Sequence, residues 1–162
     1  MMCAEKAIVF DLDGTLVDLY SVSEWLEKLR SYDATPYSAA KPIYDARELI
    51  PLIAELKSRG FRIIVTSWLS KESTKEYDSS VREAKKEWLA KYGFPYDEIH
   101  LVKYGTPKTK CSRGKAKYQI LVDDNAEVRS KWTLGATIDA NENIIPLLKA
   151  ILKEDEIGRA HV

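Results

Sequence analysis

The sequence predicts an α/β domain built around a parallel sheet. Short apolar runs alternate with longer amphipathic segments, which is the pattern of consecutive βαβ units. Most of the apolar runs are rich in β-branched residues, and this favours strands over buried helices. The length of 162 residues fits one domain, and a chain of this size buries enough surface to fold without disulfides.

Five segments are expected to form the strands of the sheet. The first and the fourth, residues 7–10 and 118–122, are the strongest because they are continuously apolar or nearly so. The second, residues 61–65, follows a glycine that is typical of a helix end. Two shorter runs, residues 99–102 and 136–138, complete the set.

The segments between these strands carry helix signals. A serine followed three residues later by glutamate, a capping box, occurs at Ser21 and again at Ser80. Apolar residues then recur at helical spacing up to Gly93, and Asn143 is placed to cap a last helix. The expected helices are one over about residues 22–30, one carrying Leu49 to Leu56 before Gly60, one from Ser80 to Gly93, and one after Asn143.

Residues 18–43 interrupt the βαβ rhythm with a short helix and a polar, aromatic stretch. A connection of this length often covers a site. We therefore expect one domain over residues 1–157, with residues 18–43 as a small insert, and a disordered tail over residues 158–162, where periodicity is lost.

Composition excludes several classes of protein. Twenty-five Lys and Arg residues balance 25 Asp and Glu residues, which argues against a dedicated high-affinity nucleic-acid binder. No apolar run approaches the ~20 residues of a membrane span, and the first apolar run is too short for a secretory signal. With only Cys3 and Cys111, a disulfide framework is not expected, so the predicted location is the cytoplasm.

Two pairs of carboxylates follow two of the predicted strands. Asp11 and Asp13 come directly after the first strand, and Asp123 and Asp124 follow the fourth. Ligands of open α/β sheets bind at the carboxyl ends of strands, so adjacent strands would bring all four carboxylates into one crevice. Oxygen ligands in this number, without a Cys/His cluster, indicate Mg²⁺ rather than zinc.

Hydroxyl and basic residues complete the candidate site. Thr66 and Ser67 follow the second strand and are suited to donate hydrogen bonds to phosphate oxygens. Six cations and no acid lie from Lys103 to Lys117, and at least one of them should face the carboxylates to offset their charge.

These motifs resemble those of the haloacid dehalogenase (HAD) superfamily. Asp11-Leu12-Asp13-Gly14-Thr15, the hydroxyl pair Thr66-Ser67, a downstream lysine and Asp123-Asp124 occur in the order of its four motifs. The resemblance implies a Rossmann-like three-layer α/β/α sandwich with a mainly parallel five-stranded sheet and a minimal cap insert at residues 18–43. Within the superfamily, the sequence is most similar to 5′(3′)-deoxyribonucleotidases and small phage-type phosphatases, with the phosphatase half of polynucleotide kinase-phosphatase close behind.

The resemblance also implies a role for each residue. Asp11 would be the nucleophile and Asp13 the general acid and base. Asp11, the Asp13 carbonyl and Asp124 would hold Mg²⁺, with Asp123 bound directly or through water. Thr66 or Ser67 would donate to the phosphate, and Lys108 is the chosen motif lysine, with Lys103 and Lys110 as alternatives.

The expected function is that of a Mg²⁺-dependent phosphomonoesterase with an aspartyl-phosphate intermediate, acting on a nucleotide or a nucleic-acid end. The alternatives are a phosphatase for sugar or other small-metabolite phosphates and a catalytically weak binding module. The short insert predicts an open site, in which aromatic residues could stack a base. We expect no membrane partner, and a monomer or weak homodimer. The aromatic residues concerned are Tyr20, Trp25, Tyr32, Tyr37 and Trp68.

Overall fold

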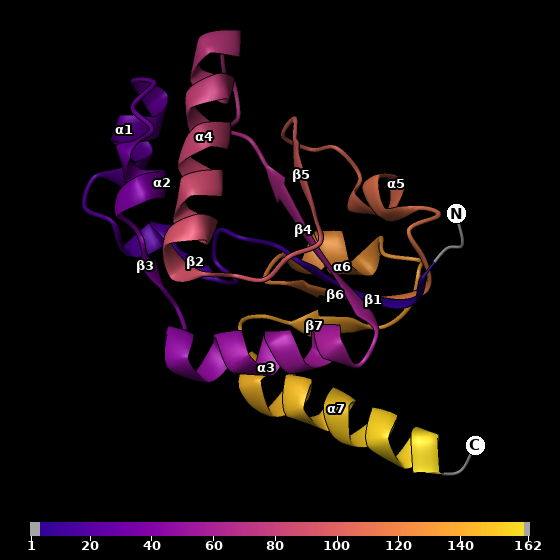
Figure 1. The fold of residues 1–162 in the computed structure, drawn as a ribbon. Coiled ribbons are helices and arrows are strands. Elements are labelled where there is room, and N and C mark those ends of the chain that lie inside the picture. The colour runs from indigo at the N-terminus through magenta and orange to yellow at the C-terminus, as the bar shows by residue number, and fades with distance from the viewer. Residues whose placement is uncertain (1–3, 161–162) are drawn as a thin grey trace.

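The central sheet of the computed structural model, which describes residues 4–160, has five parallel strands (Figure 1). Its strands are β1 (Ala4–Phe10), β4 (Phe61–Trp68), β5 (Glu98–Val102), β6 (Ala116–Asp123) and β7 (Thr137–Asp139). Their order is β5-β4-β1-β6-β7, so β1 lies in the centre, between β4 and β6. The predicted α/β class with a mainly parallel five-stranded sheet is confirmed.

Helices cover both faces of the sheet and make it the middle of three layers (Figure 1). Ile8 and Phe10 of β1 pack into a core with residues of α3, α4 and α7, whereas Val9 faces the other way, toward α6 and Trp132. This alternation follows from the period of two along a strand. The helices of the core domain are α3 (Ala46–Ser58), α4 (Lys75–Tyr92), α5 (Lys108–Ser112), α6 (Ala126–Ser130) and α7 (Ile144–Ala160).

The insert between β1 and α3 forms a small layer of its own against α4. Its elements are β2 (Val17–Asp18), the 3₁₀ turn η1 (Leu19–Ser21), α1 (Trp25–Arg30), α2 (Thr35–Ala39) and β3 (Lys41–Pro42). β2 and β3 pair antiparallel and close the base of the insert. Tyr37 and Leu19 pack against Tyr77 and Val81 of α4, so the insert is fixed to the core by apolar contacts.

Both predicted capping boxes are wrong. Ser21 ends the 3₁₀ turn, and α1 begins only at Trp25, after Glu24 in the left-handed conformation. α4 begins near Thr74, whose hydroxyl accepts a hydrogen bond from the Tyr77 amide at 3.2 Å. Ser80 therefore lies inside α4, which extends beyond the predicted start because Tyr77 adds a further apolar contact to its buried face.

Two other features differ from the expectations from the sequence. The polar, aromatic stretch before Pro42, for which no helix is predicted, contains α2, with Pro36 in its tolerant first turn. Residues 158–160, expected as part of a disordered tail, continue α7, where Arg159 donates a hydrogen bond from Nε to Asp155 at 2.9 Å. His161, Val162 and Cys3 lie outside the described residues. Within residues 4–160, no helix combines the length and apolar character that a membrane crossing requires.

Candidate active site

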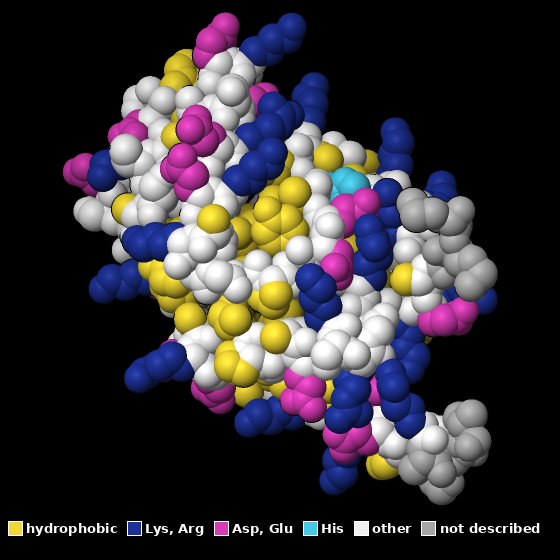
Figure 2. All heavy atoms as spheres, in the orientation of Figure 1, with side chains coloured by type: hydrophobic (Ala, Val, Ile, Leu, Met, Phe, Trp, Pro, Cys, Tyr) yellow, Lys and Arg dark blue, Asp and Glu magenta, His cyan; other side chains and the backbone are white. Residues whose placement is uncertain are grey.

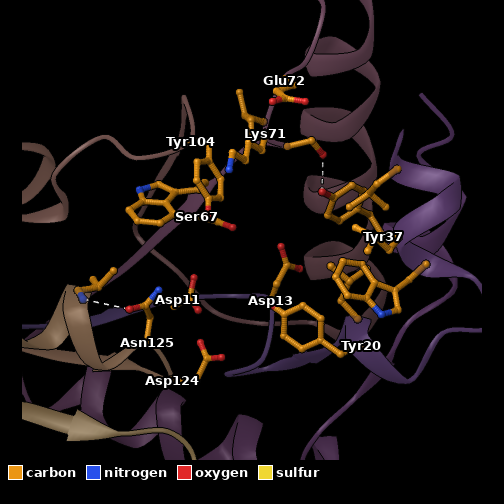
Figure 3. A pocket seen from close by; sticks show the side chains of 18 of the residues that line it. Asp11, Asp13, Tyr20, Tyr37, Ser67, Lys71, Glu72, Tyr104, Asp124 and Asn125 are labelled. Carbon is orange, nitrogen blue, oxygen red and sulfur yellow. Dashed lines mark hydrogen bonds between the residues drawn. The ribbon is translucent and has the colours of Figure 1, made fainter. Parts of the chain in front are cut away.

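Four carboxylates lie at the carboxyl ends of β1 and β6, as the motif spacing predicts. β1 and β6 are neighbours in register, with Phe10 opposite Val122, so Asp11 and Asp123 leave the sheet side by side. Side-chain oxygens of Asp11, Asp123 and Asp124 lie within 4.8 Å of one another. Figure 3 shows the side chains of Asp11, Asp13 and Asp124 gathered at one end of a pocket.

Lys108 holds two of these carboxylates together. Its Nζ donates to Asp11 Oδ1 at 2.9 Å and to Asp123 Oδ2 at 2.6 Å, and its side chain is 4% exposed. Burial works to lower the pKa of Lys108, but the charges of Asp11 and Asp123 outweigh it and raise the pKa to about 12. Lys108 is therefore charged at neutral pH, whereas the alternatives Lys103 and Lys110 are exposed.

A turn places Lys108 beside the carboxylates. Gly105 adopts a φ of 87°, and the Thr106 amide donates to the Lys103 carbonyl at 3.1 Å. Pro107 then caps α5, whose first residue is Lys108. The Gly-Thr-Pro sequence thus turns the chain back over the end of the sheet.

A second buried lysine, Lys85, pairs with Asp13. Its Nζ donates to Asp13 Oδ2 at 3.0 Å, to Ser67 Oγ at 2.7 Å and to the Trp68 carbonyl at 2.8 Å. The lysine side chain is 2% exposed, and its Nζ lies 4.9 Å from the centre of the Tyr37 ring. Burial raises the pKa of Asp13, and Lys85 opposes that shift.

Reasoning from the sequence missed Lys85, although a signal is present. Lys85 lies among Val81, Ala84 and Trp88, on the face of α4 that the apolar periodicity assigns to the core. A lysine at such a position needs a buried partner, because an isolated ammonium is costly to remove from water. The sequence contains no information on which carboxylate that partner is.

Gly14 allows the two acidic loops to approach each other. It has a φ of 82°, in the left-handed region that favours glycine. A Cβ at this position would overlap the Asp124 carboxylate and would lie 2.9 Å from Tyr20 Cε2. Thr15 also links the loops, because its hydroxyl lies 3.1 Å from Asp11 Oδ2 and 3.4 Å from Asp124 Oδ1.

The two candidate phosphate-binding hydroxyls have different surroundings. Ser67 lines the pocket, and its hydroxyl accepts the hydrogen bond from Lys85. Thr66 is fully buried, and its hydroxyl has no hydrogen-bond partner within residues 4–160. In the pairing of β1 with β4, Phe10 lies opposite Val65. The next residues along the two strands, Asp11 and Thr66, are therefore neighbours.

The donor set fits a hard divalent cation. The clustered ligand atoms are carboxylate oxygens, which Mg²⁺ prefers. Lys108 neutralises part of the charge of Asp11 and Asp123, but no Lys or Arg of residues 4–160 forms an ion pair with Asp124. Burial and the charge of Asp11 raise the pKa of Asp124 to about 7, so a bound cation would relieve this repulsion.

The basic run from Lys103 to Lys117 does not gather around the site. Within residues 4–160, Lys108 is the one cation of this run that lines the pocket. Lys115 pairs with Glu98 at 2.9 Å and Lys117 with Glu5 at 2.8 Å, near the amino end of β6. Figure 2 shows Lys and Arg side chains interspersed with Asp and Glu on the visible face.

A pocket of about 560 Å³ extends from the carboxylates to the insert. Aromatic rings line it from both sides, and two ring pairs are in contact: Tyr20 with Trp25 at 5.0 Å, and Trp68 with Tyr104 at 4.9 Å, between centroids. The Trp68 Nε1 donates to the Thr106 carbonyl at 2.8 Å, which fixes that ring. All five aromatic residues named as stacking candidates from the sequence line this pocket.

No protein-family model and no curated protein matches this sequence. Solved structures are similar in fold. One is a chain of a Pnkp1/Rnl/Hen1 complex, with a TM-score of 0.60 and 20% identity, covering 85% of this chain and 46% of that chain. This protein therefore spans less than half the length of that chain.

Two further similar structures are D,D-heptose 1,7-bisphosphate phosphatases. The enzyme from Burkholderia thailandensis has a TM-score of 0.55 and 12% identity, covering 91% of this chain and 99% of that one. The enzyme from B. bronchiseptica, complexed with magnesium and phosphate, has a TM-score of 0.56 and 11% identity. This match covers 93% of this chain and 99% of that chain. This chain therefore has the Rossmann-like α/β fold of HAD-like phosphatases, with four carboxylates and two buried lysines at the carboxyl edge of its sheet.

Proposed function

We propose that this protein is a Mg²⁺-dependent phosphomonoesterase of the HAD type, with Asp11 as its nucleophile. The observation that carries the proposal is the cluster of Asp11, Asp123 and Asp124, with Lys108 bridging two of them. The fold shared with phosphatases supports it, as does the magnesium and phosphate in the B. bronchiseptica enzyme. The cytoplasmic location and the monomeric or weakly dimeric state stay predictions from the sequence.

The residues divide the chemistry between two half-reactions. In the first, an Asp11 carboxylate oxygen attacks phosphorus, the bond to the ester oxygen breaks, and Asp13 gives that oxygen its proton. In the second, Asp13 takes a proton from water as the water attacks the phosphoaspartate, which releases phosphate and restores the Asp11 carboxylate. The raised pKa of Asp13 supports its role as a proton donor.

Lys108, Thr66 and Ser67 would prepare the site for an anionic substrate. Lys108 orients Asp11 and offsets its charge in a buried setting, where charges interact strongly. Both hydroxyls are candidates to donate to the phosphate, because Ser67 lines the pocket and the Thr66 hydroxyl has no partner within residues 4–160. Mg²⁺ held by Asp11, Asp124, the Asp13 carbonyl and Asp123 would supply charge neutralisation for the meeting of two anions.

The proposed substrate is a nucleotide or a nucleic-acid terminal phosphate. Exposed aromatic rings on both sides of the pocket favour a ligand with a flat ring, such as a nucleobase. The likeness to a chain of an RNA repair complex is in keeping with this reading. The overall charge of zero and the dispersed basic run argue against an extended binding surface for a long polymer.

A small-metabolite phosphate is the second candidate substrate. The heptose bisphosphate phosphatases match this chain almost over their whole length, whereas the Pnkp1 chain is matched over less than half. A binding module without turnover is the remaining alternative.

A substrate panel tests the function. Purified protein with Mg²⁺ is assayed for phosphate release from p-nitrophenyl phosphate, deoxynucleoside monophosphates, sugar phosphates and phosphorylated oligonucleotides. We expect turnover of p-nitrophenyl phosphate and a higher kcat/KM for the nucleotides than for sugar phosphates. Fast turnover of a sugar phosphate alone would replace the nucleotide proposal, and no turnover of any phosphate would contradict the phosphatase proposal.

A further inference from the structure

Two cations that line the pocket, outside the carboxylate cluster, have no acidic partner within residues 4–160. Arg30 ends α1, and Lys71 lies in the loop between β4 and α4; both are exposed and both line the pocket. Within residues 4–160, neither forms an ion pair with a carboxylate, whereas Arg47, Arg59 and Lys115 at the surface do so. Among the described residues that line the pocket, Glu72 is the one acid besides the four aspartates, so Arg30, Lys71 and Glu72 together carry a positive charge.

Separate elements bring these two cations to one rim. The Tyr37 hydroxyl lies 2.6 Å from Ser70 Oγ, and the Tyr77 hydroxyl donates to the Asp33 carbonyl at 2.9 Å. These contacts tie the insert, just after Arg30, to the loop that carries Lys71. In Figure 3, Lys71 and Glu72 lie at the opposite end of the pocket from Asp11 and Asp124, with Tyr104 beside Lys71.

The lining of the pocket includes several exposed aromatic and aliphatic side chains. Of the seven large hydrophobic side chains described as exposed, four line this pocket: Tyr20, Leu26, Tyr32 and Tyr104. Lys71 Nζ lies 5.9 Å from the centre of the Tyr104 ring, so this cation is already at the aromatic wall. A rim of this kind marks a contact surface for a ligand.

Backbone strain is concentrated at the same place. Three non-glycine residues of the described chain have a positive φ: Glu24 at 56°, Tyr32 at 62° and Glu72 at 54°. Tyr32 and Glu72 line the pocket, and Glu24 directly precedes Trp25, which also lines it. Left-handed residues without glycine cost free energy, and they cluster where a site requires a particular geometry.

We propose that Arg30 and Lys71 bind a second phosphate group of the substrate whose first phosphate reacts at Asp11. The pocket, at about 560 Å³, is far larger than a phosphate ion, and its two ends offer one metal site and one cationic site separated by aromatic rings. The substrate class is therefore a phosphomonoester with an aromatic ring and a second phosphate. That second phosphate belongs either to a nucleoside bisphosphate or to the first phosphodiester of a nucleic-acid end.

The test compares substrates with one and with two phosphate groups, and it rests on the proposed phosphatase function. KM is measured with Mg²⁺ for a deoxynucleoside monophosphate, a deoxynucleoside 3′,5′-bisphosphate, and dinucleotides phosphorylated at either end. We expect KM for a substrate with two phosphate groups to be about five- to tenfold lower than for the monophosphate, the scale of two solvent-exposed ion pairs. Preference for the bisphosphate or for a dinucleotide identifies the source of the second phosphate.

Variants assign this preference to the rim. The KM for the monophosphate divided by the KM for the bisphosphate should fall toward one in the double variant Arg30→Met/Lys71→Met. Added salt should reduce the same ratio in the wild type. Lys86→Met removes an exposed lysine of α4 outside the pocket and should keep the ratio. Equal KM values in the wild type, or an unchanged ratio in the double variant, would overturn the proposal.

A binding measurement separates this proposal from the proposed catalysis. Calorimetry with Asp11→Asn, with and without the rim substitutions, compares binding of the bisphosphate and the monophosphate without turnover. Tighter binding of the bisphosphate that depends on Arg30 and Lys71 would support the rim site even if no phosphatase activity were found. Equal binding of both ligands would contradict it, whatever the activity.

Discussion

At the residue scale, each charged side chain of the carboxylate cluster has a partner of opposite charge, except Asp124. Lys108 pairs with Asp11 and Asp123, and Lys85 pairs with Asp13. The Asp124 carboxylate has no Lys or Arg partner within residues 4–160, and its Oδ1 lies 3.4 Å from the Thr15 hydroxyl. A cation bound in this cluster would therefore act most strongly at Asp124.

Lys108→Met should reduce kcat/KM by about 10²–10³-fold, the range for removing one preorganised electrostatic group. The reason is that Asp11 and Asp123 would then repel each other without a bridging charge. Lys110→Met is the matched control, since Lys110 is exposed on the same short helix and should retain activity. Steady-state assays of both variants decide this, and an equal loss at Lys110 would contradict the assignment of Lys108.

Thr66→Val should lower kcat/KM by about 10–100-fold, the scale of a hydrogen bond to a charged group, while leaving Tm equal or higher. Valine keeps the shape of threonine, and the hydroxyl that is lost has no partner in the fold. Ser67→Ala is compared with it, because Ser67 already accepts from Lys85. Full activity of Thr66→Val together with a large loss in Ser67→Ala would assign the phosphate contact to Ser67 instead.

At the element scale, a buried carboxylate ties α7 to the sheet and to α3. Asp155 is 8% exposed and accepts from Lys6 of β1 at 3.2 Å and from Arg159 at 2.9 Å. Arg59, which follows α3, lies 3.9 Å away. Burial alone would raise the pKa of Asp155, but these cations lower it below its usual range.

Asp155→Asn should lower Tm by about 2–4 °C at pH 7, the shift that ~1 kcal/mol produces in a domain of this size. A carboxylate with a lowered pKa stabilises the fold above its unfolded pKa of about 3.9, and this stabilisation is lost as the pH falls through the folded value. The difference in Tm between wild type and variant should therefore shrink at about pH 3. Glu154→Gln, which changes an exposed neighbouring residue, is the control. A Tm difference between wild type and Asp155→Asn that did not depend on pH would contradict this explanation.

The elements that could be predicted from the sequence are those whose signals are local and continuous. The apolar runs of β1 and β6 and the Asn143 cap of α7 are of this kind; the Asn143 carboxamide oxygen accepts from the Ile145 amide at 3.0 Å. The start of α1 and the existence of α2 could not be predicted in the same way, because they depend on packing against α4. Tertiary contacts there outweigh the capping signal at Ser21.

The same distinction applies to the candidate site. The acidic pairs could be placed together from the strand ends alone, since neighbouring parallel strands share one edge. Lys85 could not be assigned to the site, because it lies in the middle of α4 and its partner Asp13 is distant in the sequence. The cations of the basic run could not be sorted either, because Lys115 and Lys117 find partners at the far end of β6.

At the scale of the whole molecule, the insert and the sheet edge enclose a pocket lined by a carboxylate cluster and, outside the cluster, by Arg30 and Lys71. These residues come from segments far apart in sequence, so the site exists only in the folded chain. A ligand that binds only the folded state stabilises it.

Mg²⁺ at about 100 times its Kd should therefore stabilise the fold by about 2.7 kcal/mol, or roughly 5–11 °C in Tm. Asp124→Asn should remove most of this Mg²⁺-dependent shift, because it removes one of the clustered ligands. Glu127→Gln, at an exposed position on α6, is the control. Thermal melts with Mg²⁺ and with EDTA provide the readout, and an equal shift in Asp124→Asn would place the metal elsewhere.

The most direct test of the account is phosphate release by Asp11→Asn compared with wild type, in Mg²⁺ and in excess EDTA. Asparagine is nearly isosteric with aspartate but is a poor nucleophile, so the variant should keep the wild-type circular dichroism spectrum. We expect turnover only in the wild type with Mg²⁺, and none above background in the variant. Substantial activity of a verified Asp11→Asn preparation, or full wild-type activity in EDTA, would contradict catalysis by an aspartate nucleophile with a bound metal.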